Sequence, residues 1–127
     1  MLYEVSTRKS LEEIDRALHE AAARHKFGIL TVHDLKETMR LKGVDFSRDC
    51  RIYEVCNPQQ AKRVLEAEGA ISTALPCRIS VYACEDGYRI ATLLPTAVLG
   101  LFGKPELKSV AEEVEAAIRA MVDEAAA

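Results

Sequence analysis

The chain has 127 residues, of which 49% are hydrophobic and 29% are charged, and its formal net charge is −3. This composition predicts one soluble globular domain over residues 1–127, with a core that needs no disulfide or metal. The acidic balance argues against a nucleic-acid partner, and the lack of an apolar run of about 20 residues argues against a membrane span. Since the first ten residues lack a signal-peptide core, we expect a cytoplasmic protein whose four cysteines are reduced.

The chain begins with a strand, a helix and a second strand. LYEVST (2–7) alternates between two faces and predicts the first strand. Ser10 and Glu13 have the spacing of a capping box, so a helix begins after Ser10 and ends near Gly28. ILTVH (29–33) is rich in β-branched residues and predicts a short second strand.

The middle of the chain repeats this pattern. Asp34 predicts the cap of a short helix that ends near Gly43, and CRIYEVC (50–56) predicts a third strand. Asn57 followed by proline suits the cap and first position of another helix, which ends near Gly69. AISTALP (70–76) joins this helix to the next strand.

The last third predicts a hairpin and a long helix. RISVYAC (78–84) and YRIATLL (88–94) flank the three residues EDG (85–87). Residues 93–103 read as an irregular apolar loop, and residues 106–124 carry one apolar stripe at helical spacing. The order of elements predicts an α+β fold with a single antiparallel-rich sheet backed by helices.

Five segments together resemble the bacterial and archaeal family called domain of unknown function 302. These segments are KFGILT (26–31), LKGVDF (41–46), RIYEVCNPQQAKRVLEAE (51–68), ALPCRISVY (74–82) and GKPELKSVAEEV (103–114). The resemblance implies a compact α+β domain with the layer architecture of the TATA-binding protein, and it implies homodimers. It supplies no reaction and no DNA binding. Its motifs retain Cys56 and Cys77, and they give Cys50 and Cys84 no role.

The first candidate site is the start of the helix at Asn57. Cys56 lies directly before this cap, where the partial positive charge of a helix start favours a thiolate and lowers the pKa of a thiol. The backbone N–H groups of Gln59 and Gln60 could bind a small anion there. A small apolar residue at the end of a buried strand explains Cys56 equally well. Both interpretations stay open at this point.

Cys77 is the second candidate thiol. If the strands that hold Cys56 and Cys77 pair in antiparallel fashion, the two thiols approach and could form a reversible disulfide or carry a persulfide. His33, at a strand end, could join them as a base or ligand, or serve as a polar strand cap. Glu54 shares a strand face with Cys56 and would raise the pKa of a thiol beside it. The cysteine spacing lacks CxxC, so we predict no metal and no cofactor.

The apolar segment 93–103 is the candidate interface. Such a segment either packs as core or contacts a partner, and we favour a homodimer contact through Val98, Leu99, Leu101 and Phe102.

The sequence contains no catalytic triad pattern, P-loop or GxGxxG, so enzyme activity is left open. We predict a small dimeric protein that binds a small anionic or sulfur-containing ligand, or handles sulfur or redox equivalents through Cys56 and Cys77. The alternative is a non-catalytic binding or interaction module with structural cysteines.

Overall fold

Five antiparallel strands form one sheet in the order β1-β5-β4-β3-β2. The computed structural model describes all residues, 1–127. The strands are β1 (Leu2–Thr7), β2 (Gly28–Asp34), β3 (Cys50–Cys56), β4 (Cys77–Cys84) and β5 (Gly87–Leu93). This arrangement confirms the predicted α+β class and the single antiparallel sheet.

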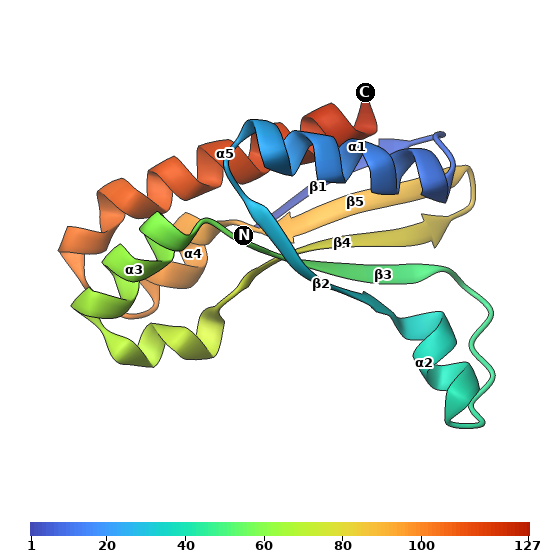
Figure 1. Cartoon of the computed structure of the whole chain (residues 1–127), viewed down its shortest axis with the longest axis horizontal. Helices are drawn as coiled ribbons and strands as arrows, with labels where there is room; N and C mark the ends of the chain where they lie inside the picture. The colour runs from blue at the N-terminus through green and yellow to red at the C-terminus, as the bar shows by residue number, and fades with distance from the viewer.

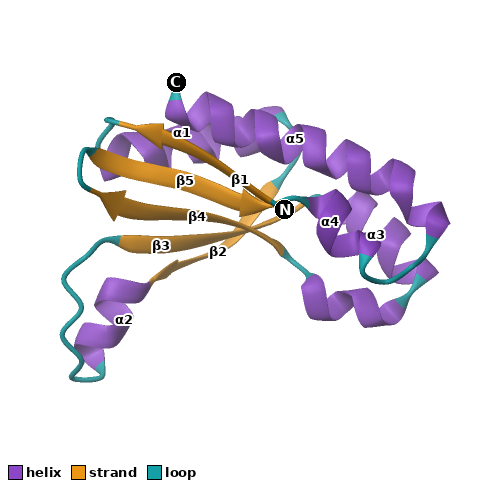
Figure 2. Ribbon diagram, turned by 180° about the vertical axis from the view of Figure 1, so that it is seen from behind, coloured by secondary structure: helices purple, strands orange, loops and turns teal.

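The helices cover one face of this sheet and gather at one of its ends. They are α1 (Leu11–Arg24), α2 (Leu35–Leu41), α3 (Pro58–Ala67), α4 (Pro95–Gly100) and α5 (Lys108–Ala126), with short 3₁₀ helices η1 (Gly69–Ala74) and η2 (Pro105–Leu107). Helices α1 and α5 lie side by side over the sheet, α3 and α4 lie beyond one end of it, and α2 projects away from the body (Figure 1; Figure 2). None of these helices has both the length and the apolar character that a membrane crossing requires.

Local capping explains where the first helices begin. Ser10 Oγ accepts the N–H of Glu13 at 3.2 Å, and Glu13 Oε1 accepts the N–H of Ser10 at 3.0 Å, so the predicted capping box is present. Asp34 Oδ1 accepts the N–H of Glu37 at 3.0 Å at the start of α2. Helix α1 ends before the expected Gly28, which instead begins β2.

The core lies between the helices and the covered face of the sheet. Its fully buried side chains come from α1, α5, η1 and the three central strands. The largest of them are Ile14, Leu18, Tyr53, Ile71, Ile79, Ile90, Ile118 and Met121. On β4, Ile79 and Val81 are buried while Ser80 and Tyr82 are not, which confirms the predicted alternation.

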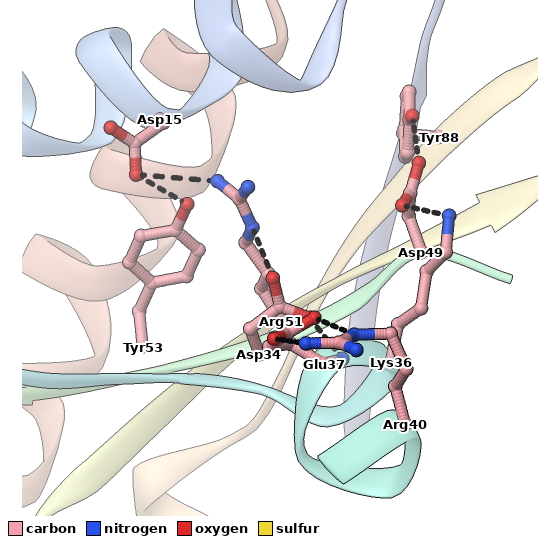
Figure 3. A network of polar contacts seen from close by, with 9 residues as sticks. All are labelled: Asp15, Asp34, Lys36, Glu37, Arg40, Asp49, Arg51, Tyr53 and Tyr88. Carbon is pink, nitrogen blue, oxygen red and sulfur yellow. Dashed lines mark hydrogen bonds and ion pairs between the residues drawn. The ribbon is translucent and has the colours of Figure 1, made fainter. Parts of the chain in front are cut away.

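None of the residues of helix α2 is buried. Polar contacts connect this helix to the sheet. Lys36 Nζ lies 3.4 Å from Asp49 Oδ1, and Tyr88 donates its hydroxyl to Asp49 Oδ2 at 2.7 Å. Arg51 Nε lies 3.9 Å from Asp34 Oδ2 at the root of the helix. Figure 3 shows this network running from the sheet into α2. This network of polar contacts holds α2 in place although the helix lies outside the core.

The same network reaches α1 through Asp15. Tyr53 donates its hydroxyl to Asp15 Oδ1 at 2.7 Å, and Arg51 Nη1 lies 3.9 Å from the same oxygen (Figure 3). Burial, and then the bond to Asp15, raises the pKa of Tyr53 above its ordinary value. The phenol therefore stays neutral and fastens α1 to β3.

The segment 93–103 is not the irregular loop that its composition indicates. Most of it forms α4, with Pro95 in the first turn, where the fixed φ of proline suits a helix. Leu99 is buried, and both the N–H and the hydroxyl of Thr96 donate to Glu115 Oε1, at 3.0 and 2.6 Å. Packing against α5 therefore makes this stretch helical, although its proline and glycines indicate a loop.

The turn between β4 and β5 is also tighter than expected. Cys84 pairs with Gly87, so only Glu85 and Asp86 form the loop. Gly87 has φ of +145°, and a Cβ there would lie 2.4 Å from the carbonyl oxygen of Thr7. This position requires glycine both for its backbone conformation and for its close approach to the end of β1.

We expect Gly87→Ala to lower the free energy of unfolding by roughly 1–3 kcal/mol, because it forces a side chain into this conformation and against Thr7. Urea unfolding followed by circular dichroism measures the change. Gly69→Ala is the matched control, since no heavy atom lies within 4 Å of its added Cβ. Equal losses in the two variants would show that Gly87 has no special role.

Candidate functional site

A cavity of about 360 Å³ lies at the end of the sheet where α3, α4 and η1 gather. Eighteen residues line it, and thirteen of them are hydrophobic. They come from the first residue, the end of β3, α3 with its cap, η1 and the two residues after it, the start of β4, the end of β5, α4 and the residue after it, and α5. The volume and the apolar wall are those of a small-molecule site, for which roughly 300–1,000 Å³ is usual.

The pairing of β3 with β4 forms one wall of this cavity. Val55 pairs with Cys77 in the antiparallel register, so β3 ends where β4 begins. Asn57 Oδ1 then accepts the N–H of Gln60 at 3.1 Å and caps α3, as the sequence predicts. This geometry brings four of the predicted site residues to one cavity: Cys56, Asn57, Gln60 and Cys77.

The two thiols have pKa values above, not below, the ordinary value. All four cysteines are free, and Cys56 and Cys77 are half-buried. Burial raises the pKa of Cys56, and burial together with the neighbouring Cys56 raises the pKa of Cys77 to about 11. The expected lowering by the helix start is therefore overcome. At neutral pH both groups are protonated and form part of an apolar wall.

His33 does not lie with the thiols. It pairs with Ile52 across β2 and β3, whereas Cys56 pairs with Gly28 at the other end of the same two strands. Its Nε2 lies 2.8 Å from Glu54 Oε1. The expectation that His33 assists Cys56 is corrected by this register, because strand neighbours several residues apart do not meet.

Glu54 has ion partners other than the thiols. Glu54 faces His33 and also lies 3.8 Å from Arg78 Nε, so the ion partners of its carboxylate are these two side chains. No group of three or more histidine, cysteine, aspartate or glutamate side chains is placed to hold a metal ion. Gln59 is exposed and lies outside the cavity wall.

Three polar side chains remain in the wall: Asn57, Gln60 and Arg78. Gln60 Oε1 is buried and has no hydrogen-bond partner. Arg78 is the only charged residue among the eighteen, and sequence reasoning missed it. Strand alternation alone places Arg78 on the open face of the sheet. In the sequence, only the four-residue spacing of Gln60 and Val64 indicates that these two wall residues lie on the same face of α3.

The residues predicted as a dimer contact mostly pack within the chain. Leu99 is buried, Phe102 packs against the core, and Val98 lines the cavity. Leu101 is 79% exposed and lies at the cavity with Met1 and Leu93, which are also exposed. Intramolecular packing thus describes Leu99 and Phe102, while Val98 and Leu101 lie at the cavity.

A larger concavity near the β4–β5 turn is a weaker candidate. It is open, has a volume of about 1110 Å³ and contains four hydrophobic residues among eleven. Its charges are mixed, since Arg8, Arg48 and Arg89 lie there with Glu85 and Asp86. It therefore presents no single sign of charge to a ligand.

We expect Cys56 and Cys77 to react with iodoacetamide more slowly than a free cysteine at pH 7, because only the thiolate attacks. For Cys77 the rate should rise with pH toward the pKa of about 11. Mass spectrometry after timed labelling of Cys56→Ser and Cys77→Ser measures each thiol alone, and urea-unfolded protein gives the reference rate. Rapid labelling below pH 7 would contradict the raised pKa values.

Comparison with known proteins agrees with the fold and the motifs. The crystal structure of an uncharacterized conserved protein, DUF302, from Bacillus stearothermophilus matches with a TM-score of 0.92 and 33% identity. The match covers 98% of this chain and 97% of that one. No curated protein matches the chain. The family model described as domain of unknown function DUF302 matches residues 3–125, and the chain therefore belongs to the DUF302 family.

Proposed function

We propose that the protein binds a small, mostly apolar molecule in the cavity at the end of the sheet. The observation that carries this proposal is the wall itself, in which thirteen of eighteen residues are hydrophobic and three are polar. Small-molecule sites typically combine an apolar surface with a few polar groups that orient the ligand. Cys56 and Cys77 belong to this wall as small apolar groups.

Binding is better supported than thiol chemistry. A nucleophilic or redox thiol needs an appreciable thiolate fraction or a base within hydrogen-bond reach. Burial raises the pKa of both thiols. His33, the residue that the sequence indicates as a possible base for them, is instead paired with Glu54. The same wall that disfavours a thiolate favours an apolar ligand, which gains about 0.8 kcal/mol for each buried methylene. Part of this gain is offset by the entropy lost on association.

A larger side chain in the cavity wall should prevent binding. We expect Ala61→Phe to reduce the binding of 1-octanol at least about tenfold, because Ala61 lines the cavity and the new ring occupies the space of the alkyl chain. Amide chemical shifts in a nuclear magnetic resonance titration report the binding. Ala67→Phe makes the same change at an exposed position of the same helix, and it should leave binding unchanged. The proposal fails if wild type shows no saturable shifts around the cavity.

The homodimer stays a prediction, and Leu101 is the residue that tests it. A contact through residues 98–102 depends on Leu101, because it is 79% exposed while Leu99 is buried within the chain. We expect Leu101→Glu to shift a homodimer to monomers in sedimentation experiments, with no loss of thermal stability. A dimer that persists in this variant would place the interface on another surface.

A further inference from the structure

Arg78 carries the only charged side chain in the cavity wall. None of the eighteen lining residues is acidic. The side chain of Arg78 is 64% exposed, which places the guanidinium at the rim of the cavity instead of inside it. A molecule in the apolar cavity therefore meets one cationic side chain and no acidic side chain among the residues that line it.

The guanidinium of Arg78 has unused hydrogen-bonding capacity. It carries five N–H donors, and none makes a hydrogen bond within the chain. Its nearest acid is Glu54, whose Oε2 lies 3.8 Å from Arg78 Nε, beyond hydrogen-bond distance. The other oxygen of Glu54 lies 2.8 Å from His33 Nε2. Glu54 thus lies in ion-pair range of the guanidinium without occupying its donors.

The backbone beneath Arg78 is fixed. Thr92 is buried on the neighbouring β5, and its hydroxyl donates to the carbonyl oxygen of Arg78 at 2.8 Å. On the other side, Arg78 pairs with Glu54 of β3 in the sheet register. Strands on both sides therefore hold Arg78 in place at the rim.

Resting on the proposed function, we infer that the ligand is a small amphipathic carboxylate. Its apolar body fills the cavity, and its carboxylate pairs with the Arg78 guanidinium, whose planar fork matches two carboxylate oxygens. The start of α3 offers an anion little, because Pro58 has no N–H and the N–H of Gln60 already donates to Asn57.

Octanoate and 1-octanol separate this inference from the proposed function, because they share an eight-carbon chain and differ in charge. At pH 7 and low salt we expect wild type to bind octanoate at least about tenfold more tightly than 1-octanol. Arg78→Gln should remove this preference by weakening octanoate binding at least about tenfold more than 1-octanol binding. Raising the ionic strength should weaken the preference in wild type, since Arg78 is exposed to solvent.

Arg89→Gln is the matched control. Arg89 lies on the same open face one strand away, has one acidic neighbour, Glu4, at 3.4 Å, and lines no part of this cavity. Its substitution should leave the affinities for both probes unchanged. Equal binding of the two probes by wild type, or a preference that survives Arg78→Gln, would overturn the carboxylate inference. In that case saturable 1-octanol binding would still support the proposed function. Failure of both probes to bind would overturn the two together.

Discussion

The antiparallel register between β3 and β4 is the constraint on which the candidate site depends. Tyr53 and Val55 are buried under the helices, while Glu54 between them reaches the open face. A slip of one residue would exchange these faces and expose the core side chains, so the register is strongly specified. Because Val55 pairs with Cys77, the same register sets where β3 ends and β4 begins. The cavity follows from this meeting of two strand ends with α3.

Two effects compete at Cys56. The helix start at Asn57 favours a thiolate, typically by about 0.3–1 kcal/mol on an exposed surface, whereas burial disfavours the thiolate and raises the pKa of Cys56. Cys77 lies at no helix start, and burial together with the neighbouring Cys56 raises its pKa to about 11. Both thiols are therefore protonated at neutral pH and form part of the apolar wall.

Features set by neighbours along the chain could be predicted from the sequence. The capping box of Ser10 and Glu13 depends on residues three apart, and the Asn57 cap with its following proline depends on adjacent ones. The alternation along β4 likewise revealed which side chains face the core. These signals were sufficient for the strands, for most of the helices and for the α+β class.

Features set by contacts between distant segments could not be predicted in this way. Leu99 becomes helical and buried because α5 packs against it, and nothing within residues 93–103 indicates that contact. Arg78 reads as an exposed strand residue, because its place at a cavity rim depends on where α3, η1 and α4 lie. The placement of His33 failed for a related reason, since a residue type suited to assist a thiol carries no information on strand register.

The core and the cavity wall share residues. Ile14, Ile90 and Ile118 are fully buried between the α1–α5 layer and the sheet. Val55, Val64, Leu99 and Val114 belong both to the buried core and to the cavity wall, so a substitution at one of these four positions changes the core as well as the wall. Functions reside in sites carried by a fold, and the fold alone does not specify the ligand. Under the proposed function the choice of ligand rests on the wall residues of this chain, and Arg78, the only charged side chain among them, is the most informative.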